Sequence, residues 1–335
     1  MRLDDELVTV LREAGLLGAG EIANAFILEG GVSSDVVCAD TPKGRVCIKR
    51  ALPRLKVARE WRAPIGRSMN EAAYLDVVNG LCPGTVPRVL HVDRARGLFV
   101  MPYLAPDDYP CWKTLLAKGE ADAGFAERMG GMLGQIHAAG AQHKASLALR
   151  FANHDLFHTL RIEPYLLTTA IAHPDCAEDM HSIVASIGRN ARVLVHGDVS
   201  PKNILVGSKG PVLLDAECAT WGDPAFDVSF CLAHLLLKAV WHQEFTRGYV
   251  SVFDGFCAGY FAQVSFESCA DLDRRSVPLL AALLLARVDG KSPVEYLAGE
   301  MQKRFVRDAA RTYLKAPPNT LRDLAAGWYE RALRA

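Results

Sequence analysis

Short polar side chains gather at the two ends of one predicted β-hairpin. The β-branched runs 204–206 and 212–214 flank a Gly-Ser-Lys-Gly turn, which predicts paired strands. The residues that could do chemistry lie just outside these strands: His196, Asp198, Asn203, Asp215 and Glu217. Hairpin pairing would bring them together, so that several oxygen ligands converge beside one further carboxylate. Such oxygen-rich sites suit Mg²⁺ bound together with phosphate groups.

The order His-Gly-Asp, four residues, Asn, then a strand ending in Asp resembles the catalytic core of the aminoglycoside phosphotransferase and choline kinase families, which are relatives of the protein kinases. The resemblance implies that Asp198 accepts the proton of an attacking hydroxyl. It also implies that Asn203 and Asp215 hold Mg²⁺ on the phosphates of ATP. Glu217 completes an Asp-x-Glu pattern and is a further candidate for metal or water. The alternative is a hairpin whose polar groups only satisfy the backbone.

Two more residues are expected to support this loop. Asp223 and Pro224 are suited to begin a helix, and Asp227 would lie in its first turn. Asp227 resembles the family aspartate that braces the backbone of the catalytic loop. His196 belongs to the same supporting layer, so neither residue is expected to touch the reacting groups.

The first hundred residues contain elements that could hold a nucleotide. Two β-runs enclose a Gly-Gly-Val-Ser-Ser loop in which Gly31, Ser33 and Ser34 can bring donors close to phosphates. Most Gly-Gly hairpins are only turns, so the assignment of this loop depends on the strand after it. That strand, 45–49, ends in Lys49 amid apolar residues and reads like the phosphate-binding lysine strand of kinases. The alternative is a strand-end lysine in solvent.

A buried lysine needs an anionic partner. The helix predicted over 67–81 offers Glu71, whereas Glu60 outside it is the alternative. After the next strand, Met101, Pro102 and Leu104 form the expected hinge between two lobes. Pro102 keeps the carbonyl and Leu104 keeps the N–H that an adenine base would pair with.

Some segments resemble methylthioribose kinases in particular: the run 51–57 followed by Trp61, and the segments 86–89 and 99–101. That family uses arginines from a late helix, so Arg287 and Lys291 are candidate substrate contacts, together with Trp221. For Arg287 and Lys291, a position at a solvated helix end is an equal alternative. The segment 154–158 is expected near the acceptor rather than in a zinc site. The adjacent arginine pair of methylthioribose kinases is absent, and they lack an Asn at position 203, which leaves other acceptors open.

The composition narrows the class of protein. The 335 residues include 38 basic and 38 acidic side chains, a balance that indicates neither nucleic-acid nor membrane-surface binding. Neither half of the chain is strongly charged, which weakly disfavours a polycationic acceptor because such an acceptor would favour a markedly acidic second half. Nine scattered cysteines without a Cys-x-x-Cys motif predict reduced thiols in a cytoplasmic protein. The longest apolar run, 277–286, contains a proline and is too short for a membrane span. Homodimer formation is left open.

We therefore expect an α+β, protein-kinase-like fold with a β-rich lobe over 1–102 and a mainly helical lobe over 103–335. The expected activity is transfer of the γ-phosphate of Mg-ATP to a small-molecule hydroxyl, with a sugar such as methylthioribose as acceptor. An aminoglycoside or choline-type acceptor is one alternative, and a catalytically silent nucleotide-binding module is another. A protein kinase is disfavoured because too few residues separate Asp215 from Asp227 for a long activation loop.

Overall fold

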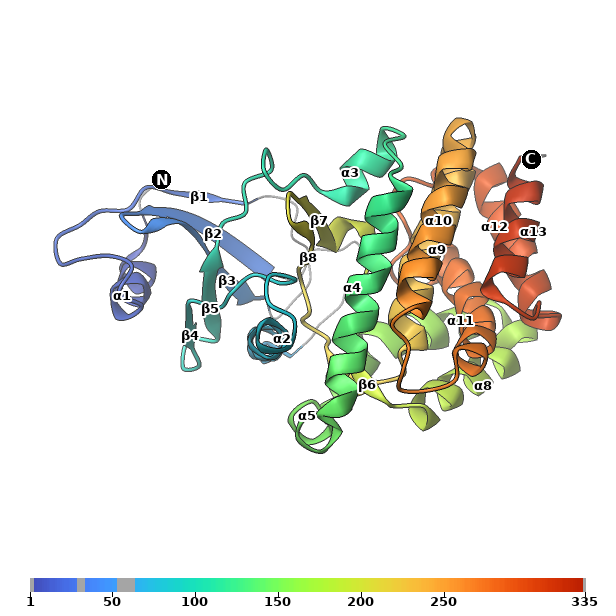
Figure 1. Ribbon diagram of the computed structural model, residues 1–335, viewed down its shortest axis with the longest axis horizontal. Helices are drawn as coiled ribbons and strands as arrows, with labels where there is room; N and C mark the ends of the chain where they lie inside the picture. The colour runs from blue at the N-terminus through green and yellow to red at the C-terminus, as the bar shows by residue number, and fades with distance from the viewer. Residues whose placement is uncertain (1–2, 29–33, 53–63, 334–335) are drawn as a thin grey trace.

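The computed structural model describes residues 3–28, 34–52 and 64–333 and consists of two lobes (Figure 1). The smaller lobe is built on an antiparallel five-stranded sheet in the order β1-β2-β3-β5-β4. Its elements are α1 (Asp5–Glu13), β1 (Ala25–Ile27), β2 (Ser34–Thr41), β3 (Gly44–Ala51), α2 (Arg67–Leu81), β4 (His91–Asp93) and β5 (Leu98–Pro102). The predicted β-rich lobe is confirmed.

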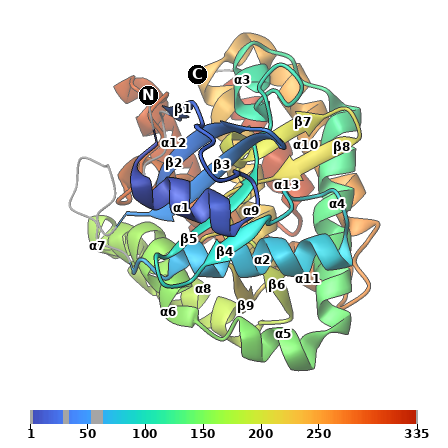
Figure 2. The ribbon, with the colours of Figure 1, turned by 90° about the vertical axis from the view of Figure 1, so that its left-hand side faces the viewer.

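Successive side chains of β3 point alternately to the two faces of this sheet. Val46 and Ile48 are buried in a small core with α1, which crosses one face of the sheet (Figure 2). Cys47 and Lys49 point to the opposite face and line a cavity between the lobes. The period of two therefore places Lys49 on the inner face, as its phase in the strand predicted.

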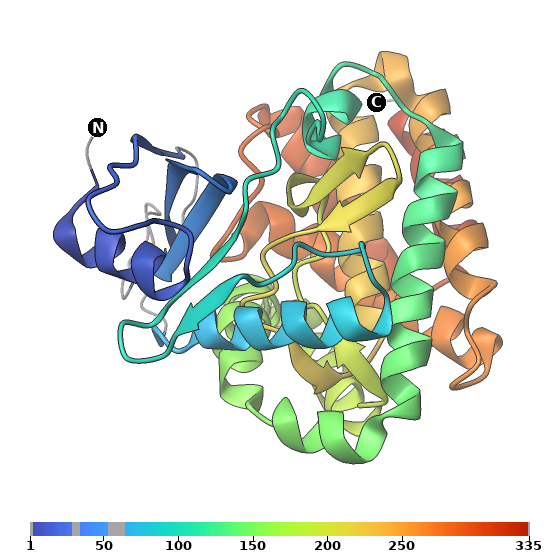
Figure 3. The ribbon, with the colours of Figure 1, turned by 60° about the vertical axis from the view of Figure 1, so that its left-hand side comes forward.

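The helix α2 lies between the sheet and the larger lobe (Figure 3). It begins and ends at the expected residues, Arg67 and Leu81. Its apolar face, Ala72, Leu75 and Val78, is buried in the main core of the protein. This packing fixes the direction in which the polar residues of the same helix point.

The larger lobe is mainly helical. Its helices are α3 (Trp112–Ala117), α4 (Ala123–Gln142), α5 (Lys144–Arg150), α6 (His154–Phe157), the π-helix η1 (His158–Leu167), α7 (Thr168–Ala172), η2 (Pro174–Cys176), α8 (Ala177–Arg189), η3 (Pro201–Asn203), α9 (Ala225–Trp241), η4 (Gln243–Phe245), α10 (Thr246–Phe261), α11 (Cys269–Asp289), α12 (Glu300–Lys315) and α13 (Leu321–Ala332). Two small antiparallel ribbons complete it: β6 (Val193–Val195) with β9 (Thr220–Gly222), and β7 (Ile204–Gly207) with β8 (Gly210–Leu213).

Three local features differ from the sequence expectation. The strands β7 and β8 pair as far as Gly207 and Gly210. The turn therefore consists of the two residues between these glycines, whereas a four-residue turn that included both was predicted. The helix α9 begins at Ala225, one residue later than expected, although the Asp223 carboxylate still accepts a hydrogen bond from the Ala225 N–H at 3.0 Å. The π-helical segment η1, which contains Pro164, was not predicted by any pattern.

Helix α9 is the centre of the larger lobe, with every residue from Ala225 to Val240 buried. In the described part of the chain, no single helix is long and apolar enough to cross a membrane. The pair Ala225–Trp241 and Gln243–Phe261 meets that test only when taken together, with a bend of 118° between its members.

Helices α4 and α10 lie side by side, and glycines allow their backbones to approach closely (Figure 1). A Cβ atom added to Gly259 would lie 1.9 Å from the carbonyl oxygen of Glu127. One added to Gly130 would lie 2.1 Å from that of Phe256. These distances are well below van der Waals contact with backbone atoms that cannot move independently, so the close packing of the two helices requires glycine at both positions.

We expect Gly259→Ala to lower the free energy of unfolding by about 1–3 kcal/mol or more, because the two helices must separate to admit the methyl group. Gly188→Ala is the matched control, since a Cβ there meets no atom within 4 Å in α8. Its helix propensity should raise stability by up to about 1 kcal/mol. Urea unfolding of both variants measures this, and equal stabilities would contradict the packing argument.

Candidate active site

A buried lysine joins the two lobes at the floor of the site. Lys49 Nζ lies 2.8 and 2.7 Å from the two carboxylate oxygens of Glu71 on α2. The same atom lies 2.5 Å from Asp215 Oδ1, which belongs to the larger lobe. Burial alone would lower the pKa of Lys49, but Asp215 and Glu71 outweigh it and raise the pKa, so the ammonium stays charged.

Asp215 adopts an unusual backbone conformation. Its φ of 70° is the only positive value among the described residues other than glycine. Such a conformation costs free energy and is typical of functional positions. Burial would raise the pKa of the Asp215 carboxyl, yet Lys49 and Lys202 lower it, which keeps the group ionised.

The two ends of the β7–β8 hairpin converge, as the sequence indicated. The Leu214 N–H donates to the carbonyl oxygen of Asn203 at 2.9 Å. The Asn203 amide nitrogen donates in turn to the Asp198 carbonyl at 3.1 Å. The backbone carrying Asp198 is therefore tied to the strand that delivers Asp215.

The loop before this hairpin is held by one fully buried carboxylate. Asp227 accepts hydrogen bonds from the backbone N–H groups of His196 and Gly197, both at 2.7 Å. His137, itself bonded to Tyr260, lies 3.2 Å from the same carboxylate. Gly197 has a φ of 80°, and a Cβ there would lie 2.9 Å from Cys218 Sγ, so the loop requires glycine.

The His196 ring links this loop to the second strand. Its Nδ1 accepts from the Asp198 N–H at 3.1 Å, and its Nε2 lies 3.1 Å from the carbonyl oxygen of Leu214. A carbonyl can only accept, so the proton belongs on Nε2. Burial lowers the pKa of His196, which keeps the ring neutral in this role.

Two cations contact the carboxylate of Asp198. Arg161 Nη2 lies 3.1 Å and Lys202 Nζ lies 3.2 Å from Oδ2. Arg161 comes from the π-helix η1 and also donates to the Gly197 carbonyl. Sequence reasoning missed both residues. Lys202, four positions after Asp198, could have been found from its spacing, whereas Arg161 gave no signal beyond its nearness to the segment 154–158.

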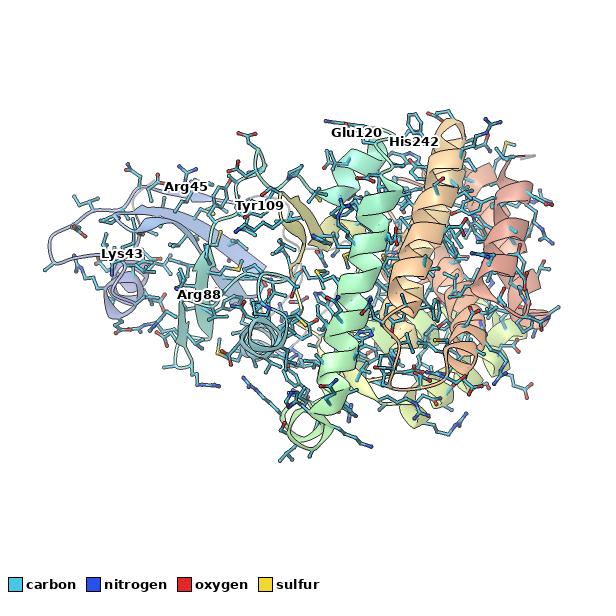
Figure 4. All side chains as sticks on the ribbon, viewed as in Figure 1. Lys43, Arg45, Arg88, Tyr109, Glu120 and His242 are labelled. Atoms are coloured by element: carbon cyan, nitrogen blue, oxygen red, sulfur yellow. The ribbon has the colours of Figure 1, made fainter. Side chains whose placement is uncertain are left out.

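A cavity of about 470 Å³ lies between the lobes, a volume suited to a small ligand. The residues from the sequence prediction that line it are Ser34, Lys49, Glu71, Met101, Pro102, Leu104, Asn203 and Asp215. Apolar side chains form its remaining walls, among them Leu28, Val36, Leu205 and Leu214. Tyr109, which lies at the junction of the two lobes (Figure 4), packs against Gly207 at the tip of the hairpin. The predicted strand, hinge and hairpin thus meet around one space.

Other predicted residues lie elsewhere. Glu217 is buried, and Arg67 on α2 donates to its carboxylate at 3.0 Å. Burial raises the pKa of Glu217. Trp221 lies in β9, paired with Leu194 and packed in the main core, so the structure does not bring it to the cavity.

Arg287 is placed near the end of α11, where it donates to the Tyr165 hydroxyl at 3.2 Å. Lys291 Nζ, beyond that helix, is 3.8 Å from Glu163. Both lie outside the lining of the cavity between the lobes. Gly31, Ser33, Glu60 and the segment 53–57 with Trp61 fall outside the described residues.

Comparisons with known proteins agree with this geometry. A methylthioribose kinase of Oryza sativa subsp. japonica is 27% identical over 221 residues, covering 58% of this chain and 51% of the relative. A methylthioribose kinase of Erwinia tasmaniensis is 28% identical over 219 residues, covering 58% and 54%. The chain therefore spans about half the length of the curated relatives it matches.

Solved structures share the fold at low sequence identity. An amicoumacin kinase in complex with AMP-PNP, Ca²⁺ and Ami is 13% identical with a TM-score of 0.58, covering 97% of both chains. A spectinomycin phosphotransferase in complex with ADP and spectinomycin is 13% identical with a TM-score of 0.51, covering 99% of both chains. Residues 27–265 match the sequence profile of the phosphotransferase enzyme family, and this chain belongs to that family.

Proposed function

We propose that this protein is an ATP-dependent small-molecule kinase that transfers a phosphoryl group to a substrate hydroxyl. The observation that carries the proposal is the Lys49 ammonium held between Glu71 and Asp215 at the wall of the cavity between the lobes. A buried cation fixed by two carboxylates suits the binding of phosphates, whose charge it can share. The complexes of the two structural neighbours with AMP-PNP and ADP support a nucleotide in this space.

The cavity offers a distinct place for each part of the nucleotide. The base would lie against the hinge, pairing with the Pro102 carbonyl and the Leu104 N–H, between apolar residues such as Val36 and Leu214. The phosphates would then extend toward Lys49. Ser34, at the start of β2, lines the same cavity.

The donor set fits Mg²⁺ held jointly by protein and nucleotide. Asp215 offers an ionised carboxylate and Asn203 an amide oxygen, both hard oxygen ligands. Within the described residues, no group of three His, Cys, Asp or Glu side chains could hold a metal alone. Phosphate oxygens and water would therefore supply the remaining ligands, and the ion would neutralise charge on the phosphates when bound. Glu217, engaged by Arg67, would act through water rather than directly.

Asp198 is placed to act as the base. Its backbone is held by Asn203 and His196, and its carboxylate is oriented by Arg161 and Lys202. It would accept the proton of the acceptor hydroxyl as the oxygen attacks the phosphorus. Fixed geometry and charge stabilisation account for most of the rate enhancement in such reactions.

The acceptor is proposed to be a sugar-type compound, with methylthioribose the first to test because the curated relatives carry that activity in their names. Aminoglycosides and choline are the alternatives. A panel of these acceptors with Mg-ATP decides among them. Mg-ATP binding without turnover on any small alcohol would instead indicate a silent nucleotide-binding module.

We expect Asp198→Asn to fold normally and to lose about 10²–10⁴ in kcat, because the amide cannot accept the proton. Mg-ATP affinity, measured by calorimetry, should change little since Asp198 does not line the nucleotide cavity. Steady-state turnover at saturating acceptor is the measurement. Near-normal turnover would remove Asp198 from the role of base.

We expect Lys49→Met to lower the free energy of unfolding by about 3–5 kcal/mol, because it leaves the buried carboxylate of Glu71 and the partly exposed one of Asp215 without their shared cation. The double variant Lys49→Met with Glu71→Gln should recover part of this loss. Lys43→Met, at the exposed turn between β2 and β3 (Figure 4), is the control and should change stability by less than about 0.5 kcal/mol. If the stability change of the double variant equals the sum of the changes caused by Lys49→Met and by Glu71→Gln alone, Lys49 and Glu71 do not interact.

A further inference from the structure

A row of side chains on α9 leads away from the candidate base. Phe230, His234 and Lys238 are spaced four residues apart and so share one face of the helix. The guanidinium carbon of Arg161, which binds Asp198, lies 5.7 Å from the Phe230 ring. At about 1.5 Å per residue, Lys238 lies about 12 Å further along the helix axis. The row therefore begins beside the arginine that contacts Asp198 and ends at a lysine.

Lys238 is an unusual lysine. It is only 1% exposed, and within the described part of the chain its Nζ has no hydrogen-bond partner. The rings of Trp241 and Tyr296 lie 5.1 and 5.0 Å from Nζ. Burial lowers the pKa of Lys238 to about 8, so the ammonium is still mainly charged at neutral pH. Cation–π contacts offset only part of the cost of an unpaired buried charge.

Further cations surround the same row. Burial is the main cause that lowers the pKa of His234. The positive charges of four nearby residues lower it further: Arg287, Lys238, Lys202 and Lys113. Arg287 lies 5.6 Å from the Tyr165 ring, and its Nε has no partner among the described residues. Two carboxylates lie beside these four cations: Glu295, which Lys113 binds, and Asp198, which Lys202 binds. Positive charge therefore exceeds negative charge around this row of side chains.

We propose that the acceptor carries an acidic group, a carboxylate or a phosphate, which pairs with Lys238 and Arg287 while its hydroxyl lies at Asp198. The partly exposed rings of Trp241 and Tyr296 cover Lys238, and its flexible four-carbon chain can turn the ammonium toward the ligand. This inference rests on the proposed kinase function, and it favours an acidic sugar over methylthioribose, which is neutral, as the acceptor.

The same excess of positive charge disfavours cationic acceptors. A polyamine sugar would meet like charges at Lys202, Arg287 and Lys238, which costs free energy in a partly desolvated site. The aromatic pair that could receive a quaternary ammonium already holds the ammonium of Lys238. His242 marks the end of α9 next to this aromatic pair (Figure 4).

The test is calorimetric binding to the protein saturated with Mg-ADP. The probes are D-ribonate and D-ribose 5-phosphate as acids, D-ribose and methylthioribose as neutral compounds, and choline and kanamycin as cations. We expect an acidic probe to bind most tightly, and ribonate against ribose 5-phosphate distinguishes a carboxylate from a phosphate. Lys238→Met should weaken that binding at least tenfold without changing the affinity for Mg-ATP or for neutral probes.

The controls separate binding from folding. Lys238→Met removes an unpaired buried charge, so its Tm should equal or exceed that of the unchanged protein. Lys43→Met should leave every affinity unchanged. The inference is overturned by tighter binding of a neutral or cationic probe, by acidic binding that survives Lys238→Met, or by a protein that binds Mg-ATP but neither acid. Failure to bind Mg-ATP at all would instead overturn the kinase proposal on which this inference rests.

Discussion

The contact of one ammonium with two carboxylates across the junction of the lobes is the constraint on which the rest of the site depends. Lys49 is carried by the sheet, Glu71 by α2 and Asp215 by the hairpin of the larger lobe. The buried ammonium of Lys49 and the buried carboxylate of Glu71 depend on each other, and the partly exposed Asp215 adds a second anion to the same cation. The bridge therefore holds the three elements in one arrangement, and the unfavourable backbone conformation of Asp215 is maintained by the contacts around it.

A second layer of contacts places Asp198 relative to this bridge. Asp227 binds the backbone of the loop, and His196 and Asn203 connect that backbone to the strand leading into Asp215. Most of these bonds involve backbone groups. The separation of Asp198 from Lys49 is consequently set by the polypeptide fold and not by flexible side chains, which suits the proposed reaction because phosphoryl transfer depends on positioning.

Much of this could be predicted from local patterns. The hairpin, the lysine strand and the helix 67–81 each have a hydrophobic period that predicts where their polar residues lie. The pairing of Lys49 with Glu71 was predicted because a buried cation needs an anionic partner. Arg161 could not be found in this way. It reaches Asp198 from a π-helix, whose hydrogen-bond pattern has no clear signature in sequence. The pairing of Arg67 with Glu217 and the core position of Trp221 likewise depend on how distant elements pack.

The π-helix η1 has a consequence for how insertions and deletions would act on this chain. One residue inserted into or deleted from a helix turns everything beyond it by about 100°. A single such event in the segment 158–167 would change which side chain faces the carboxylate of Asp198. It would leave the hairpin, the lysine bridge and the nucleotide cavity untouched, because those belong to other elements. The side chain that contacts Asp198 from η1 can therefore change through one insertion or deletion, while the elements that line the cavity between the lobes keep their own packing.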